Sequence, residues 1–451
     1  MALLEGGAVY SVGGRVRDEV LGELGRPQPP AADLDYLITG LELSDVIERL
    51  RQRGSAELVG ASFGVVKFTV DGSTVDVALP RRERPIGPHH RDFEVQSAPD
   101  VPVEDDLARR DFRINMMARR LADGALVDPY GGREDLEAHR LDITRPEVFE
   151  EDPLRILRGA QFAARFELTP TPAAMSAMRD AAPRLPSVSA DRMADEMTKL
   201  LTRAERPSIG FEILREAGAL TYVMPELLEG WAVEQNEFHR YTVYYHSLRT
   251  VDAIRKDLIL RLAALLHDIG KPRTKSGPHF YRHELVGTEM TLKILERLRF
   301  GRDVGLRVSH LVRHHMFSTD DAMSDAAIRR FISRVGTDAI EGLFALRKAD
   351  VVASGLPERN PAELDRFAGR VRRELAGSTA FGVPQLAIDG RTVIEEMVAL
   401  GLAPADFRGD ERVGDALRHL LDAVLDDPTK NETSMLRKLA REYLRSGAAE
   451  H

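Results

Sequence analysis

Two aspartates near the start of the chain, Asp33 and Asp35, are separated by a single leucine in a strand-like segment. Alternate residues of a β-strand point to the same face, so we expect the two carboxylates to lie side by side. Neighbouring carboxylates repel each other unless a cation lies between them. Mg²⁺ prefers oxygen ligands, and two such ions can activate an attacking hydroxyl and stabilise a leaving pyrophosphate. The pair predicts a magnesium site, with an exposed acidic turn as the alternative.

A glycine turn, Gly13-Gly14, precedes this acidic pair and lies between a predicted strand and a predicted helix. Glycines at such a turn let a phosphate approach the backbone N–H groups of the helix N-terminus. Arg17 would add charge-assisted hydrogen bonds to a triphosphate. A Gly-Gly turn alone indicates only a structural turn, whereas its position before the acidic pair favours a nucleotide site. Asp76 is either a third carboxylate of this site or an exposed residue at a strand end.

A third polar group, Asp152 and Arg155, lies at the start of a predicted helix. Residues three apart share a helix face. A carboxylate only accepts hydrogen bonds and a guanidinium only donates them. Cytosine and adenine each carry an exocyclic amine beside an acceptor nitrogen, which this pair complements. Uracil and guanine present a carbonyl and an N–H instead, and would leave buried polar groups mismatched. Ion pairing on a helix surface is the alternative interpretation.

Histidines are frequent in the middle of the chain, where an apolar helix ends in His267-Asp268-Ile-Gly. An adjacent imidazole and carboxylate could bind one metal ion such as Zn, Mn, Fe or Ni. Neutral imidazole is the commonest metal ligand, and such sites lower the pKa of bound water. The alternative is a helical scaffold in which hydrogen bonds satisfy the histidines.

The secondary structure that must position these groups differs between the first part of the chain and the rest. The first 130 or so residues predict short strands and helices with turns between them, and helical spacing of apolar residues dominates from about residue 147. We therefore expect an α+β fold, with a small mixed α/β head followed by a mostly α-helical remainder. The expected limits are residues 1–145 for the head, 146–233 for a helical neck, 234–355 for the histidine-rich part and 356–451 for a helical tail.

Composition narrows the class of protein. A chain of 451 residues should hold about two to four domains, and its 43% hydrophobic and 30% charged residues exclude a collagen-like or disordered protein. With no cysteine, disulfide partners and thiolate zinc sites are excluded. Because no apolar stretch is long enough to span a membrane and no signal peptide is evident, we expect a cytoplasmic protein with no membrane partner. A net charge of −9 still allows local basic patches that bind nucleic acid.

Four ordered motifs together resemble the polymerase-β-like nucleotidyltransferases, in the branch of class II CCA-adding enzymes that includes bacterial poly(A) polymerases. They are the glycine turn with the acidic pair, residues 104–118, residues 128–136 and residues 151–158. The resemblance implies that Asp33 and Asp35 are catalytic Mg²⁺ ligands, and that the nucleotide is bound by Gly13, Gly14, Arg17, Arg110, Asp152, Arg155 and Arg158. Residues 84–103 resemble the family's mobile loop.

The order of histidines and aspartates resembles the HD superfamily of metal-dependent phosphohydrolases. This resemblance implies a core metal set of His246, His267, Asp268 and Asp350, with a transition metal such as Ni, Mn or Zn. His283 and His314 are possible further ligands, and His315 is an alternative to His314. Hydrolysis of 2′,3′-cyclic phosphates or 2′-nucleotides is implied only by analogy.

The resemblances together imply template-independent addition of C and A from CTP and ATP to the 3′ end of tRNA. A poly(A) polymerase, or an enzyme that adds only CC or only A, is the related alternative. An HD phosphohydrolase with an RNA-binding head is an alternative of a different class. The chain departs from the family pattern at Arg113, Met116 and Gln161, where Thr, Ala and Arg are common, and these changes could alter CTP/ATP switching.

Overall fold

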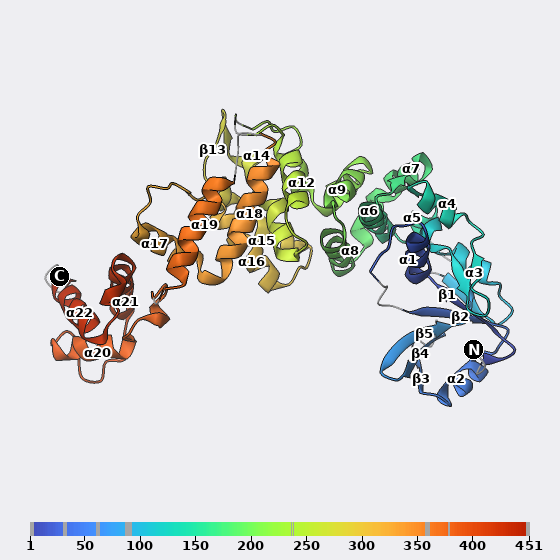
Figure 1. Cartoon of the computed structure of the whole chain (residues 1–451), viewed down its shortest axis with the longest axis horizontal. Coiled ribbons are helices and arrows are strands. Elements are labelled where there is room, and N and C mark those ends of the chain that lie inside the picture. Colours follow the sequence, from blue (N-terminus) through green and yellow to red (C-terminus); the bar gives the residue numbers. More distant parts are fainter. Residues whose placement is uncertain are drawn as a thin grey trace. The chain divides into compact units, whose positions relative to one another are not determined.

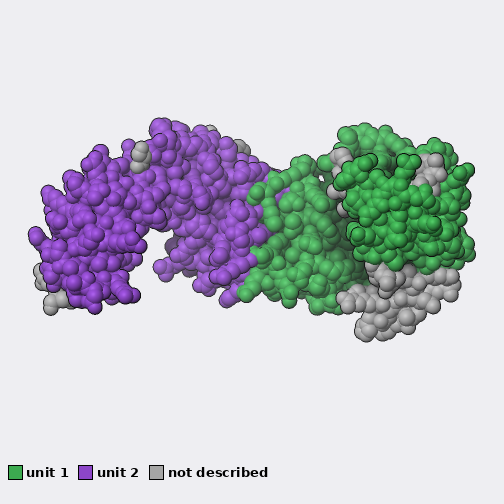
Figure 2. Space-filling model, turned by 90° about the horizontal axis from the view of Figure 1, so that it is seen from below, with its two compact units in different colours: residues 1–229, 256–258, 294–301 green, residues 230–255, 259–293, 302–451 purple. Residues whose placement is uncertain are grey.

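The structure, a computed structural model, describes residues 4–29, 34–59, 64–85, 93–235, 237, 239–356, 361–377 and 379–447. The chain divides into two compact units, coloured separately in Figure 2. Unit 1 comprises residues 1–229, 256–258 and 294–301, and unit 2 comprises residues 230–255, 259–293 and 302–451. The expected α+β fold is confirmed, because a mixed sheet near the N-terminus is followed by helices (Figure 1).

Unit 1 begins with a seven-stranded sheet of strand order β3-β4-β5-β2-β1-β8-β9. Strand β1 pairs antiparallel with β2 and β8, and β2 runs parallel to β5. The strands are β1 Ala8–Val12, β2 Asp35–Thr39, β3 Ser55–Val59, β4 Val65–Val70, β5 Ser73–Ala78, β8 Ala118–Arg120 and β9 Leu126–Val127. The expected loop at residues 84–103 is in part a hairpin, because β6 (Arg81–Pro85) pairs with β7 (Phe93–Ser97).

Strand β1, in the interior of this sheet, is buried on both faces, and the alternation of its side chains explains how. Val9 packs with Ile38 and with Val46 of helix α2 on one face. Tyr10 packs with Leu107 of helix α3 on the other. Successive strand residues point to opposite faces, so a continuous apolar run is what a sheet covered on both sides requires.

Helices make up the rest of unit 1. They are α1 Gly14–Glu23, α2 Leu43–Arg51, α3 Val103–Ala108, α4 Gly132–Glu137, α5 Val148–Glu151, α6 Leu154–Phe166, α7 Pro172–Ala181, α8 Ala190–Arg203, α9 Pro207–Glu216, α10 Leu220–Val223 and α11 Pro225–Leu228. In α6, ten of the thirteen residues are buried, so the arginines at 155 and 158 lie on the narrow polar face that remains. A Cβ at Gly210 of α9 would lie 2.9 Å from the Ala160 carbonyl oxygen, so this glycine permits close packing on α6.

Unit 2 is helical apart from a short hairpin, β12 (Lys275–Ser276) with β13 (His279–Phe280). Its helices are α12 Val243–Ala253, α14 Lys271–Thr274, α16 Arg302–His314, α17 Asp325–Val335, α18 Ile340–Ala353, α19 Ala362–Leu375, α20 Gly390–Ala399, α21 Glu411–Asp426 and α22 Thr433–Gly447. Helices α13 (Leu258–Leu266) and α15 (His283–Arg297) lie mostly in the same unit. Among the described residues, no helix is long and apolar enough to cross a membrane.

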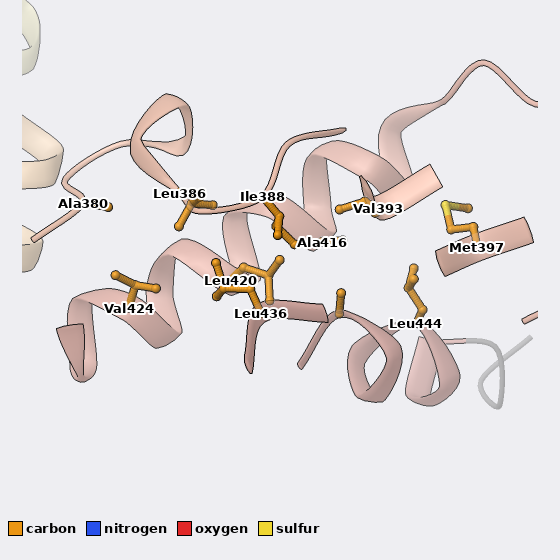
Figure 3. Packing of buried hydrophobic residues seen from close by; sticks show 11 residues of the cluster. Ala380, Leu386, Ile388, Val393, Met397, Ala416, Leu420, Val424, Leu436 and Leu444 are labelled. Carbon is orange, nitrogen blue, oxygen red and sulfur yellow. The ribbon is translucent and has the colours of Figure 1, made fainter. Parts of the chain in front are cut away.

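The last three helices, α20, α21 and α22, have a hydrophobic core of their own (Figure 3). Val393, Leu420 and Leu436 are fully buried in it, one from each helix. The buried Glu396 carboxylate at its edge is paired with Arg437 and Arg441. These two arginines are therefore engaged within the tail itself.

Candidate functional site

The acidic strand of the head is β2, and Asp35 is its first residue. In the parallel pair β2–β5, Asp35 is in register with Asp76, and register partners project to the same face of a sheet. Asp76 also forms an ion pair with Lys67, with Nζ and Oδ1 3.0 Å apart. Asp33 lies outside the described residues, so its place beside Asp35 stays a prediction.

The glycine turn lies directly against this carboxylate. Gly13 has a φ of +74°, a backbone conformation that residues with a side chain rarely adopt. A Cβ at this position would lie 3.2 Å from Nη1 of Arg110 and 3.5 Å from Oδ2 of Asp35. The missing side chain thus leaves room for a ligand between an acidic oxygen and a guanidinium. Such a cradle fits a divalent cation that carries a triphosphate.

One cavity of about 1010 Å³ in unit 1 is lined by Asp35 and by all the residues that the sequence assigned to nucleotide binding, whereas Asp76 is not among its lining residues. The predicted residues that line it are Gly13, Gly14, Arg17, Asp35, Arg110, Asp152, Arg155 and Arg158. The residues come from the turn after β1, from α1, from β2, from the segment after α3, from the link between α5 and α6, and from α6 itself, so the fold brings them together from distant parts of the sequence. The cavity is large enough for a nucleotide.

Arg17, predicted to bind the nucleotide, lines the cavity and is also engaged by protein groups. Its Nε and Nη2 donate to Oδ1 of Asp18 at 2.9 and 2.7 Å, and its Nη1 donates to Oδ1 of Asn115 at 2.7 Å. The guanidinium lies 4.5 Å from the centre of the Phe166 ring. Burial lowers the pKa of Arg17, against the opposing effect of Asp18. The side chain therefore braces the glycine turn from within the cavity wall.

Asp111 is the buried counter-charge of this wall. Its Oδ2 accepts from Nε and Nη2 of Arg158 at 2.9 and 2.7 Å, and its Oδ1 accepts from Nδ2 of Asn115 at 2.8 Å. Burial raises the pKa of Asp111, but Arg158 and Asn115 outweigh burial and hold the pKa below its usual value. One carboxylate thus links the turn arginine, through Asn115, to an arginine of helix α6.

Helix α8 contributes cavity residues that sequence reasoning missed, among them Arg192, Glu196 and Lys199. Nη2 of Arg192 lies 2.6 Å from Oδ2 of Asp152, the proposed base-selecting carboxylate. Oε1 of Glu196 lies 3.5 Å from Nη1 of Arg158 and 2.8 Å from Nζ of Lys199. The spacing 192, 196, 199 marks one face of a helix and was the available sequence signal. Nothing in the sequence indicated which helix that face contacts.

The remaining predicted arginines are held by acceptors. Nη2 of Arg110 lies 3.0 Å from the fully buried Asp106 carboxylate. Arg155 donates to the carbonyl oxygens of Val148 and Arg109 at 3.1 and 3.3 Å. Fixed guanidinium groups lose little conformational freedom when a ligand binds, so the cavity is preorganised for an anion.

A second polar centre lies in unit 2, where histidines and aspartates from α12, α15, α18 and the ends of α13 and α16 meet. We call it the His/Asp cluster: His246, His267, Asp268, His283, His315 and Asp350, with His239 beside it. Three subsets of these residues place ligand atoms within 4.8 Å of one another. The predicted core set is thus brought together, along with His283.

Hydrogen bonds at the outer ring nitrogens fix the tautomers of three imidazoles. Nδ1 of His267, His283 and His315 lies 2.9, 2.8 and 2.7 Å from the carbonyl oxygens of Ala264, Phe280 and Val312, respectively. A carbonyl can only accept, so each Nδ1 carries a proton and Nε2 is the ring nitrogen that faces the cluster. This is the arrangement that metal-binding histidines require.

The two carboxylates of the cluster are fully ionised. Burial raises the pKa of Asp268, but His267 and Lys271 outweigh burial and lower it well below the usual value. For Asp350, hydrogen bonding and charge from His246 similarly overcome burial. Two anionic groups with converging imidazole nitrogens fit a divalent transition metal ion.

His314 is not part of the cluster, which corrects the expectation that it is a further ligand. Its ring contacts that of His310, 4.6 Å away, and burial lowers its pKa to about 4. Successive residues on a helix point about 100° apart, so only one of His314 and His315 can face the cluster. His239 was not predicted; burial lowers its pKa to about 3, so it too is neutral.

Comparisons with known proteins agree with both centres. Residues 9–142 match the poly A polymerase head domain, residues 167–230 match the probable RNA and SrmB-binding site of polymerase A, and residues 239–359 match the HD domain. The chain therefore has the domains of a polymerase-type nucleotidyltransferase joined to an HD domain.

Relatives identify the family within this class. The multifunctional CCA protein of Ralstonia nicotianae is 38% identical over 344 residues, covering 72% of this chain and 76% of its own. That of Dechloromonas aromatica is 32% identical over 439 residues, covering 93% and 98%. The chain belongs to the multifunctional CCA protein family.

Solved structures share the fold. The CCA-adding enzyme of Bacillus stearothermophilus in complex with CTP gives a TM-score of 0.71 at 22% identity, over 100% of this chain and 97% of that one. The Thermotoga maritima CCA-adding enzyme complexed with tRNA gives a TM-score of 0.55 at 18% identity, over 97% and 92%.

Replacing Asp111 with Ala should lower the free energy of unfolding by about 2–4 kcal/mol, because Arg158 and Arg17 lose a buried counter-charge. Urea unfolding at pH 7 measures the change. Since the pKa of Asp111 is lowered on folding, its stabilisation is present above about pH 4 and lost as acid protonates it. The wild type and the Asp111→Ala variant should therefore converge in stability at low pH.

The matched control is Asp123→Ala, which removes an exposed carboxylate 3.2 Å from Arg120 and should change stability little. Equal effects of the two substitutions would contradict the role of Asp111 as a buried counter-charge.

Proposed function

We propose that this chain adds C, C and A from CTP and ATP to the 3′ end of tRNA without a nucleic acid template. The observation that carries the proposal is the single cavity that contains Asp35, the glycine turn and the pair Asp152 and Arg155. The names of the relatives favour CCA addition over poly(A) synthesis and over addition of C or A alone. We infer a cytoplasmic protein, because tRNA, CTP and ATP are the proposed substrates.

Asp35 and Asp33 would hold Mg²⁺ at the start of β2, and Asp76 lies on the neighbouring strand on the same face. Mg²⁺ held by these carboxylates would supply activation of the terminal 3′-hydroxyl and charge stabilisation of the leaving pyrophosphate. The backbone N–H groups after Gly13 bind the triphosphate at the start of α1, and Arg110 neutralises part of its charge.

Base selection rests on Asp152 and Arg155. The Asp152 carboxylate accepts from the exocyclic amine of cytosine or adenine, and the Arg155 guanidinium donates to the adjacent ring nitrogen. Arg192 acts as a positioning residue, because its contact with Oδ2 of Asp152 fixes the carboxylate that reads the base. Arg158, fixed by Asp111, closes the same side of the cavity.

We also propose that the HD domain is a metal-dependent phosphohydrolase. The supporting observation is the set of three imidazoles with fixed tautomers that converge on two ionised carboxylates. A transition metal ion bound there supplies a water of lowered pKa as the nucleophile. The proposed divisions of the chain are residues 1–145 for the head, 146–233 for the neck, 234–355 for the HD domain and 356–451 for the tail.

Asp35→Asn should slow nucleotide addition by about a hundred- to ten-thousandfold, because the amide lacks the charge that binds Mg²⁺. The assay supplies tRNA ending at the discriminator base with CTP, ATP and Mg²⁺, and sequences the products; the wild type should add C, C, A. Asp45→Asn, the same change at an exposed position of α2, is the control. A wild-type rate in Asp35→Asn would refute the metal role of Asp35.

Arg192→Ala should raise the KM for CTP and ATP about tenfold and increase the misincorporation of UTP, because Asp152 loses a charge-assisted hydrogen bond. Arg192→Lys should recover part of the affinity. The control is Arg184→Ala, which breaks an exposed ion pair with Glu150. A raised KM for tRNA with an unchanged KM for CTP would instead assign Arg192 to RNA binding.

His267→Ala should reduce the transition metal content of the purified protein, measured by plasma mass spectrometry, and abolish hydrolysis of adenosine 2′,3′-cyclic phosphate. His314→Ala, outside the cluster, should keep the metal. CCA addition should persist in both variants, since the head binds its own ions. Loss of metal from both variants equally would contradict the assigned ligand set.

A further inference from the structure

The segment between Asp268 and Glu284, which adjoins the His/Asp cluster in sequence, is rich in basic residues. Residues 269–283 contain four Lys or Arg side chains and no acidic one. Three of these cations, Arg273, Lys275 and Arg282, are exposed. Three consecutive aromatic residues, His279, Phe280 and Tyr281, lie between Lys275 and Arg282. Basic residues combined with aromatic ones are the composition that binds single-stranded nucleic acid.

This segment folds as the hairpin β12–β13, with Lys275 opposite Phe280 and a turn at Gly277. Both of its ends are fixed to the His/Asp cluster. Before the hairpin, Nζ of Lys271 lies 2.6 Å from Oδ2 of Asp268. After it, Nδ1 of His283 donates to the Phe280 carbonyl oxygen at 2.8 Å. The hairpin is therefore held at a set position beside the cluster.

The chain changes direction sharply between the hairpin and the cluster. Tyr281 is 67% exposed, while His283, two residues later, is 5% exposed. Arg282 between them has a φ of +58°, a conformation that a non-glycine residue rarely adopts. The backbone thus points one side chain at the metal site and holds the preceding aromatic ring in solvent.

The exposed ring of Tyr281 lies next to the ring of His279, and the two together form a larger aromatic surface. The ring centres of Tyr281 and His279 lie 5.3 Å apart with an angle of 32° between their planes. Phe280, between them, packs inward under Lys271, whose Nζ lies 5.5 Å from the ring centre. The rings of His279 and Tyr281 thus form an aromatic outer face next to the hairpin, and the inward packing of Phe280 holds this face in position.

We propose that the hairpin β12–β13 is the nucleotide-binding platform of the HD domain. A nucleobase stacks on Tyr281 and His279, while Arg273, Lys275 and Arg282 attract the phosphates of the strand. Tyr281 is only two residues from His283, so a phosphate ester attached to the stacked nucleoside would reach the His/Asp cluster. The substrate class is a nucleotide, or the end of an RNA strand that bears a phosphate. This inference rests on the proposed phosphohydrolase function.

Stacking is tolerant of base identity, because every base has a π-face. Adenosine and cytidine esters should therefore be hydrolysed about equally well. The presence of a base should affect kcat/KM more than the identity of that base. An ester without any base should be a poor substrate, even though the metal ligands that act on its phosphate are the same.

The test compares adenosine 2′-monophosphate with 2-glycerophosphate, a monoester without a base. Water adds to phosphorus and the ester oxygen leaves in both cases, giving inorganic phosphate and an alcohol. Tyr281→Ala should lower the ratio of kcat/KM values, nucleotide over glycerophosphate, about five- to a hundredfold, mainly through the KM for the nucleotide. Tyr281→Phe keeps the ring and should keep the ratio.

Tyr222→Ala, which removes a 40% exposed tyrosine in unit 1, is the control and should keep the ratio. An unchanged ratio in Tyr281→Ala, or a fall that Tyr281→Phe shares, would overturn the platform.

Failure of the platform can be separated from failure of the phosphohydrolase function. If the wild type hydrolyses neither ester, calorimetric titration with adenosine 2′-monophosphate still tests the platform, because the wild type must bind it at least fivefold more tightly than Tyr281→Ala. Equal binding would overturn the platform. If Arg282→Glu abolishes binding of the nucleotide and Tyr281→Ala does not, the surface recognises charge alone, as it would an acidic protein, and the platform is again overturned.

Discussion

The head cavity depends on one buried carboxylate, that of Asp111. Placing arginine side chains in a protein interior is costly unless each has a counter-charge and hydrogen-bond acceptors. Asp111 neutralises Arg158 directly and reaches Arg17 through Asn115. At the Arg158 end, Glu196 of α8 continues the alternation of charge. The wall of the cavity is thus a single chain of opposite charges.

The base selection that we propose needs groups that are held just as firmly. Asp152 and Arg155 can discriminate between bases only if neither moves to suit the wrong one. The contact of Arg192 with Asp152, and the carbonyl acceptors of Arg155, fix both side chains before a nucleotide arrives. Their hydrogen bonds are then available at little entropic cost, and a mismatched base leaves them unsatisfied.

The sequence predicted the parts of this arrangement that depend on local spacing. The Asp35 strand, the Gly13 turn and the helix of Arg155 follow from local spacing, and residues from all three line one cavity. Asp152 was expected on the same helix, but it lies in extended backbone between α5 and α6, so its place beside Arg155 does not come from a shared helix face. Contacts between distant helices could not be predicted. Arg192 is forty residues from Asp152, and only the packing of α8 on α6 shows that they meet.

The His/Asp cluster shows the same limit. Its ligands could be recognised by type, but His314 and His315 differ only in the direction in which one helix turn presents them. His239 lies before α12 in a segment with no periodic pattern, so its position depends on tertiary packing alone. Residue type thus predicts that a histidine could bind a metal ion, and only packing decides whether His314 or His315 faces the cluster.

The most direct test of the account is diffraction from crystals grown with Mn²⁺ and a non-hydrolysable CTP analogue. Anomalous scattering should place an ion at the carboxylate of Asp35, with the cytosine amine within hydrogen-bonding distance of Asp152 and the triphosphate at the turn after Gly13. An ion elsewhere, or a base bound away from Asp152 and Arg155, would contradict it.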